Sequence, residues 1–162
     1  MGFILSHDFI CLTETFLTNE LSIDSFKEHV IFQKPARKLS RQGRPSGGVI
    51  CLVRKKFEKQ VKPIYTDIGN FVYLMIDKSL FGLEKDVLYA SVYVPPEGSP
   101  YYNITGLSSD GIAVLEDSLI DNVLLDNDVY VLLNGDLNSR TSNVAQPVSK
   151  DEEYLYDVLD HD

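Results

Sequence analysis

Apolar residues along this chain fall into short runs that polar loops separate. The runs are rich in β-branched and aromatic residues and predict β-strands over residues 9–15, 30–34, 47–55, 71–78, 86–94 and 128–133. Between the last two runs, Ile112, Leu115, Leu119 and Val123 recur at the spacing of one helical face. This spacing predicts a helix that begins after Asp110, as its N-cap, and ends near Asp126.

Most of the predicted strands come before the helix, and the last strand follows it. This order indicates an α/β fold with antiparallel stretches rather than a regular alternation of strands and helices. Residues 34–46 and 95–108 are rich in proline, glycine and polar residues and are predicted to be loops. No repeat or long linker divides the 162 residues, so we expect one domain over 1–162.

Composition and charge narrow the choice of partners. The formal net charge of −9 disfavours nonspecific binding to nucleic acid through overall charge, although it allows a local basic patch. No apolar run reaches the roughly 18 residues of a membrane span, and the first residues lack a basic leader. Cys11 and Cys51 both lie in apolar runs and are expected to be buried, reduced thiols. We therefore expect no membrane partner and an intracellular location, nuclear or cytoplasmic.

Polar residues at the ends of buried strands are the main chemical signal. Glu14, Tyr93, Asp136 and Asn138 all stand where an apolar run ends. A carboxylate can bind Mg²⁺ or orient a water molecule, an amide or a phenol can bind a phosphate oxygen, and alternation places Asp136 and Asn138 on one face. Residues 134–139 also have the composition of a turn, and Asp-x-Asn alone fits that interpretation better.

The loop over residues 34–46 is basic in an otherwise acidic chain. Arg37, Lys38, Arg41 and Arg44 could contact the phosphates of a nucleic acid. The same residues fit a solvated loop without a ligand. Gly47 and Gly48 are expected to permit a tight turn into the next strand rather than to cradle a phosphate, because no helix follows them.

Taken in order, "ICLTET", "GRPSGGVICLVRK", "SVYVPP" and "LLNGDLNSRT" resemble the endonuclease/exonuclease/phosphatase superfamily. Among its members, the likeness is to the endonuclease domains of LINE-type retrotransposons. The resemblance implies a four-layer α/β sandwich of two packed mixed β-sheets with outer helices. It also implies Mg²⁺-dependent hydrolysis of DNA, with Mn²⁺ as a possible substitute. Glu14 would bind the metal, Tyr93 and Asn138 would contact the phosphate, and Asp136 would act on the attacking water.

The resemblance also implies elements that this sequence does not contain. An upstream strand with an asparagine and a downstream Asp-His ending have no counterpart here, and His161-Asp162 has the wrong order. We therefore expect a partial sandwich, truncated at both ends and missing its C-terminal part, with weak or no activity. Two other functions stay open. One is a non-catalytic interaction module that self-associates through exposed sheet edges. The other is a phosphodiesterase or phosphatase that acts on a small phosphorylated substrate.

Overall fold

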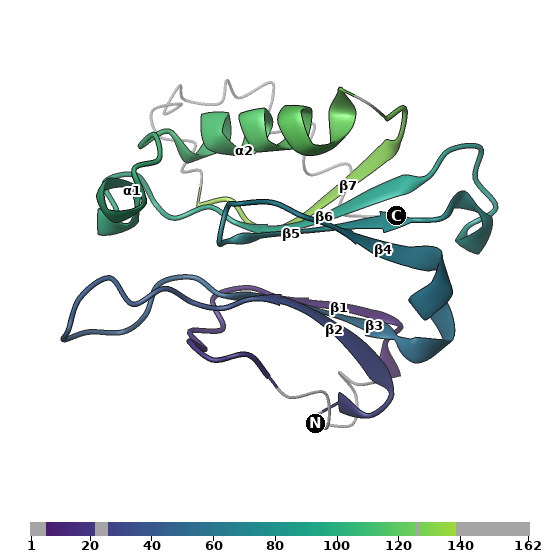
Figure 1. Ribbon diagram of the computed structural model, residues 1–162, viewed down its shortest axis with the longest axis horizontal. Coiled ribbons are helices and arrows are strands. Elements are labelled where there is room, and N and C mark those ends of the chain that lie inside the picture. Colours follow the sequence, from purple (N-terminus) through teal and green to yellow (C-terminus); the bar gives the residue numbers. More distant parts are fainter. Residues whose placement is uncertain (1–5, 22–25, 126, 139–162) are drawn as a thin grey trace, which may run out of the picture.

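Two β-sheets pack face to face in the computed structural model, which describes residues 6–21, 26–125 and 127–138 (Figure 1). The first sheet is antiparallel with the order β1-β3-β2, formed by Phe9–Leu12, Val49–Arg54 and His29–Lys34. The second sheet has the order β4-β5-β6-β7, formed by Val61–Ile64, Phe71–Ile76, Val87–Tyr93 and Tyr130–Asp136. Among the described strands, β6 and β7 pair in parallel, and the other pairings are antiparallel.

The main core lies between the two sheets. Alternate residues of β3 and β5 point into this layer and are almost completely buried, because side chains of a strand alternate between its two faces. They are Val49, Cys51, Val53, Val72, Leu74 and Ile76. On the outer face of the first sheet, Leu21 and Phe26 pack against a smaller cluster of Ile10, Ile50 and Leu52.

A helix covers the outer face of the second sheet (Figure 1). It consists of α2 (Gly111–Leu119), continued by the π-helical turn η5 (Ile120–Leu124). The side chain of Asp110 accepts hydrogen bonds from the backbone N–H groups of Ile112 (3.1 Å) and Ala113 (3.0 Å), so the predicted N-cap is confirmed. Leu115 and Val123 are buried against the second sheet, as the helical spacing predicted. Asp126, the predicted end of the helix, lies outside the described residues.

The predicted α/β fold class with two packed sheets is confirmed, although mixed pairing occurs only in the second sheet. Several elements of the described structure were not predicted from the sequence. The edge strand β4 contains Pro63, and proline at an edge costs no ladder hydrogen bond. The helix α1 (Pro100–Thr105) lies in the segment that we expected to be a loop. Short 3-10 helices occupy Lys55–Gln60 (η3) and Lys78–Leu80 (η4).

Within the described ranges, no helix combines the length and apolar character that crossing a membrane requires.

Candidate functional site

Three of the predicted site residues meet at one end of the sandwich. Tyr93 and Asp136 are register partners at the ends of the parallel strands β6 and β7. Glu14 follows β1 of the other sheet, and its carboxylate lies close enough to the Tyr93 hydroxyl to raise the pKa of that hydroxyl. The ends of three strands, from both sheets, therefore bring a carboxylate, a phenol and a second carboxylate together.

The position of Glu14 depends on an irregularity after β1. Leu12 pairs with Ile50, and the same register would place Glu14 opposite Gly48. Instead, Thr15 N donates to Gly48 O (3.1 Å). The β1 side therefore carries one extra residue, as in a β-bulge, and a bulge redirects the side chains beside it. Glu14 has a φ of 50°, which accommodates this extra residue. The predicted strand over residues 9–15 accordingly ends at Leu12.

Gly48 permits this close approach. Its φ is 91°, and a Cβ atom there would lie 2.5 Å from Thr15 Oγ1. Gly47, with a φ of 76°, would place a Cβ atom 2.2 Å from Asn70 Oδ1. Both glycines thus allow the turn into β3 that the sequence predicted, and they also let the Glu14 segment lie against β3.

Tyr93 is suited to remain a hydrogen-bond donor. Burial raises the pKa of its hydroxyl well above the usual value, and the hydrogen bond to Glu14 and the nearby charge of Asp136 raise this pKa further. The positive charge of Arg44 opposes the rise. The phenol is therefore protonated at neutral pH and faces both carboxylates with its O–H group.

Asp136 and Asn138 form a turn at the end of β7. Asp136 Oδ1 accepts a hydrogen bond from Asn138 N (2.9 Å), and Asn138 Nδ2 donates to Val94 O (3.1 Å). Alternation does not extend to Asn138, because β7 ends at Asp136 and Asn138 has a φ of 44°. The turn interpretation is therefore correct for the backbone. The second N–H of the Asn138 amide and the second oxygen of Asp136 can still meet a ligand.

Backbone strain is concentrated at this site. Among the described residues, the non-glycine residues with positive φ are Glu14, Phe16 (54°) and Asn138. Such conformations cost on the order of 1–3 kcal/mol each and occur more often at functional sites. Glu14 is one of the two carboxylates of the site, Phe16 follows it by two residues, and Asn138 follows Asp136 by two residues. This clustering marks this end of the sandwich as the candidate site.

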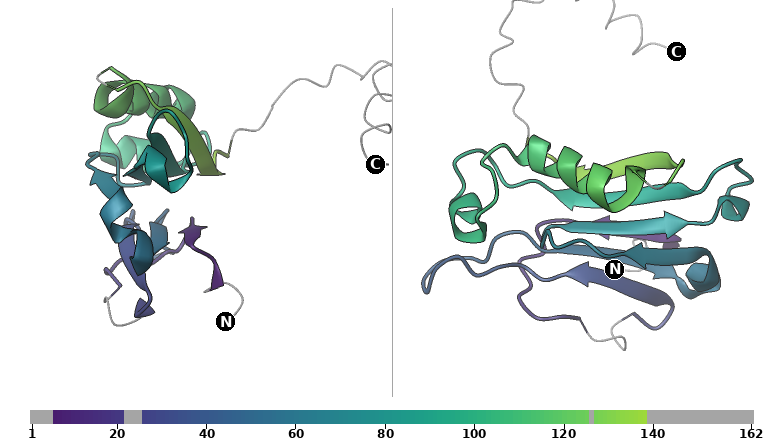
Figure 2. Two further views of the ribbon diagram at one scale, coloured as in Figure 1. Left: turned by 90° about the vertical axis from the view of Figure 1, so that its right-hand side faces the viewer. Right: turned by 45° about the horizontal axis from the view of Figure 1, so that its top comes forward.

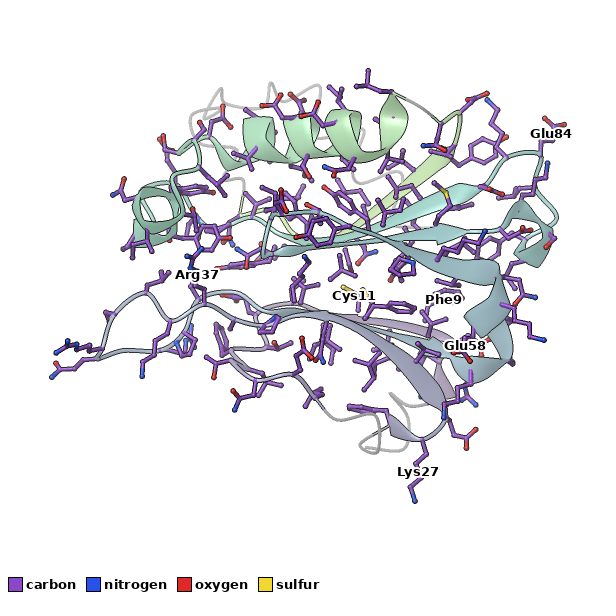
Figure 3. The ribbon with its side chains drawn as sticks, in the orientation of Figure 1. Phe9, Cys11, Lys27, Arg37, Glu58 and Glu84 are labelled. Atoms are coloured by element: carbon purple, nitrogen blue, oxygen red, sulfur yellow. The ribbon has the colours of Figure 1, made fainter. Side chains whose placement is uncertain are left out.

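The basic loop between β2 and β3 projects beyond the sheets at the end where α1 lies (Figures 1 and 2). Arg37 and Ser46 pair across the base of this loop, and Arg37 lies at the end of the molecule where α1 lies (Figure 3). Burial raises the pKa of Tyr101 of α1, and the charge of Arg37 opposes this rise. The Arg44 guanidinium stands 3.8 Å from the centre of the Phe16 ring and close enough to influence Tyr93. Lys38 and Arg41 are exposed. Of the four predicted basic residues, Arg44 is therefore the one placed beside the carboxylates.

The donor set is compatible with Mg²⁺. In the part of the chain that the structure describes, no group of three or more His, Cys, Asp or Glu side chains could hold a metal. Mg²⁺ usually keeps several waters and needs one or two carboxylates together with phosphate oxygens. Glu14 and Asp136, the two carboxylates beside Tyr93, provide the one or two carboxylates that Mg²⁺ needs.

Sequence reasoning missed two residues of this site. Phe16 supplies the ring beneath Arg44, and its role depends on the bulge after β1, which no local pattern predicts. Asn70 is buried; its backbone O accepts from Tyr93 N (3.0 Å), and its Nδ2 has no partner in the described structure. A polar residue just before the apolar run at 71–76 was the available signal for Asn70.

Comparisons with known proteins give a fold-level similarity only. No protein-family model matches the chain, and no curated protein sequence matches it. Among solved structures, the chain is similar to the human Nocturnin catalytic domain with bound sulfate anion, at a TM-score of 0.43 and 11% sequence identity. The similarity covers 85% of this chain and 53% of that one, so the chain spans about half of that domain. A similarity at this level assigns neither a family nor an activity.

Proposed function

We propose that this chain carries part of the active site of a Mg²⁺-dependent endonuclease that hydrolyses DNA, of the kind encoded by LINE-type retrotransposons. The observation that carries the proposal is the meeting of Glu14, Tyr93 and Asp136 at strand ends from both sheets. The motif order in the sequence supports the same proposal independently of the fold.

Each residue has a role that suits its surroundings. Glu14 holds the metal, Mg²⁺ or in its place Mn²⁺, and the bound ion supplies Lewis-acid stabilisation of the phosphate charge. When substrate binds, Tyr93 turns its single O–H from Glu14 to a phosphate oxygen, and its raised pKa keeps the hydroxyl protonated. Asp136 orients the attacking water and accepts its proton. Asn138, fixed through Val94, offers its second N–H to the phosphate.

Binding and hydrolysis test this proposal separately. Mg²⁺ titration followed by NMR should perturb resonances of Glu14 and Tyr93, and a short DNA duplex should perturb those of Arg44 and Asn138. We expect nicking of supercoiled plasmid by this chain to be slow. Any nicking should require Mg²⁺ and Asp136.

Substitutions at Asp136 provide the control. D136A should abolish whatever Mg²⁺-dependent nicking remains, whereas D117A, on the exposed face of α2, should not change it. Equal activity of the two variants would overturn the assignment of the site, and rapid nicking by the unmodified chain would overturn the expectation of weak activity. Tighter binding of an inositol phosphate than of DNA would favour the small-substrate alternative.

A second candidate function is strand pairing through β7, as an interaction module. This strand is the edge of the second sheet, and its apolar side chains are exposed on both faces: Tyr130 by 44%, Val131 by 45%, Leu132 by 51% and Leu133 by 38%. Parallel strands are normally covered on both faces. An exposed apolar edge without proline or lysine is a template for pairing with another strand.

Self-association of the purified chain tests this candidate. Light scattering should show concentration-dependent oligomers that L132K reduces, because a charge on β7 opposes edge-to-edge pairing. I104K adds the same charge at an exposed apolar position of α1 and should leave the oligomers unchanged. A monomer at all concentrations, or equal effects of the two variants, would contradict self-association.

A further inference from the structure

Cys11 and Cys51 lie directly opposite each other in the first sheet, although they are far apart in the sequence. They are Cα partners in the antiparallel pairing of β1 with β3. Arg54 N donates to Asp8 O at 2.9 Å, so that pair is hydrogen-bonded. Because hydrogen-bonded and non-hydrogen-bonded pairs alternate, Cys11 and Cys51 occupy a non-hydrogen-bonded pair, in which Cα atoms are about 4.5 Å apart. This separation lies within the range that a disulfide requires.

The Cys11 side chain faces the second sheet (Figure 3), and Cys51 lies in the core cluster between the two sheets, against which Cys11 packs. Cys11 Sγ contacts Ser91 Oγ of β6, and Ser91 Oγ in turn donates to Asn134 Oδ1 of β7 at 2.8 Å. The Ser91 hydrogen is therefore engaged, and the neutral Cys11 thiol donates to Ser91. Cys51 is fully buried, whereas Cys11 is half-buried on the edge strand β1. A small reagent can reach Cys11 first.

A hydrogen bond from the Cys51 thiol lowers the pKa of Cys11 to about 7, although burial opposes the shift. The same hydrogen bond, together with burial, raises the pKa of Cys51 well above its usual value. Cys11 is therefore the cysteine of the pair that ionises at the lower pH, while Cys51 stays a thiol. A thiolate is the form of cysteine that reacts with oxidants.

We propose that Cys11 and Cys51 form an oxidation site that a hydroperoxide converts to a disulfide within the folded chain. The Cys11 thiolate attacks the O–O bond, a sulfur–oxygen bond forms, and hydroxide leaves, so that Cys11 becomes a sulfenic acid. The Cys51 sulfur then attacks the Cys11 sulfur, the sulfur–oxygen bond breaks, and water leaves with the thiol proton. The two thiols are oxidised and one hydroperoxide is reduced.

Intact-mass measurement of the full chain after treatment with hydrogen peroxide tests the proposal. The native protein should lose the mass of two hydrogen atoms, without a gain of oxygen. A proteolytic digest should contain one peptide pair that joins residues 11 and 51. Dithiothreitol should reverse both changes. The oxidised chain should also unfold at a higher temperature than the reduced chain, because the disulfide closes the loop between the two residues.

Single substitutions separate this pathway from general oxidation. In C51S the Cys11 thiolate lacks a partner, so it should accumulate as a sulfenic acid that dimedone labels. In C11S the buried Cys51 should stay reduced until the chain is unfolded. Circular dichroism verifies that both variants are folded, and the measurement on the unsubstituted chain needs neither of them. Retention of both thiols, stepwise gain of oxygen without a disulfide, or disulfide-linked dimers from the native chain would each overturn the proposal.

Discussion

The carboxylate of Glu14 and the hydroxyl of Tyr93 come from different sheets and lie close enough together for Glu14 to raise the pKa of Tyr93. Tyr93 is the last residue of β6 in the second sheet, and Glu14 follows β1 in the first. Residues of both sheets therefore form the site, and its geometry depends on how the two sheets pack.

Removing the charge of Glu14 should weaken Mg²⁺ binding. E14Q keeps the size of the side chain and its ability to accept from Tyr93, but it loses one of the two carboxylates available to the ion. We expect Mg²⁺ affinity to fall roughly 10-fold or more, since even outer-shell changes at metal sites have effects of this size. Isothermal titration calorimetry measures the change. E20Q, an exposed position on the same segment, should bind Mg²⁺ as the unsubstituted chain does, and equal affinities of both variants would refute the role of Glu14.

Arg44 should contribute more to DNA binding than the other arginine at the tip of the loop. Both arginines are exposed, but the Arg44 guanidinium stands 3.8 Å from the centre of the Phe16 ring and close enough to Tyr93 to influence its pKa. R44A should lower DNA affinity and reduce the slope of log K against log salt by about 1, the change for one lost phosphate contact. Fluorescence anisotropy at several salt concentrations measures both. If R41A produced the same loss, the basic loop would act only as diffuse charge.

Gly135 should be essential for the pairing of β6 with β7 beside Asp136. Its φ is 128°, and a Cβ atom there would lie 1.9 Å from the backbone oxygen of Val92, its register partner. We expect G135A to lower the free energy of unfolding by roughly 3 kcal/mol or more, because backbone must move to relieve the clash. Urea denaturation measures this change.

Gly82 provides the matched control for this substitution. It also has a positive φ, 65°, but nothing lies within 4 Å of a Cβ atom built there. G82A should therefore cost only the conformational penalty of about 1–2 kcal/mol. A similar loss in both variants would mean that the contact with Val92 is unimportant.

The fold was predictable wherever a run of residues carried its own periodicity. The strands around Val49–Arg54, Phe71–Ile76 and Val87–Tyr93 and the helix after Asp110 were predicted from pattern alone. The helix α1 was missed because six residues are too short for an apolar repeat, although Ser99 caps it and Gly106, with a φ of 72°, ends it. Capping signals without periodicity are easily taken for a turn.

The site was predictable only in part, because its geometry is tertiary. Strand ends predicted Glu14, Tyr93 and Asp136, but the left-handed conformation of Glu14 arises from the close approach to Gly48, more than thirty residues further along the chain. The pairing of Cys11 with Cys51 likewise depends on strand register. Register is set by which faces are buried after the sheets pack, and a single sequence does not display it.

Tyr73 should make stability fall at alkaline pH. Burial raises its pKa from 10.0 to about 12, while its hydrogen bond to Ser118 Oγ (3.1 Å) opposes the rise. Because the folded-state pKa is the higher one, this contribution is complete below pH 10 and is lost as pH rises from 10 to about 12. Two pKa units correspond to about 3 kcal/mol.

Urea denaturation at several pH values should show that Y73F lacks the contribution of Tyr73 to this alkaline loss of stability. S118A keeps the phenol, so it should keep the alkaline loss while costing about 1 kcal/mol at neutral pH. An alkaline loss in Y73F as large as that in the unsubstituted chain would show that other groups cause it.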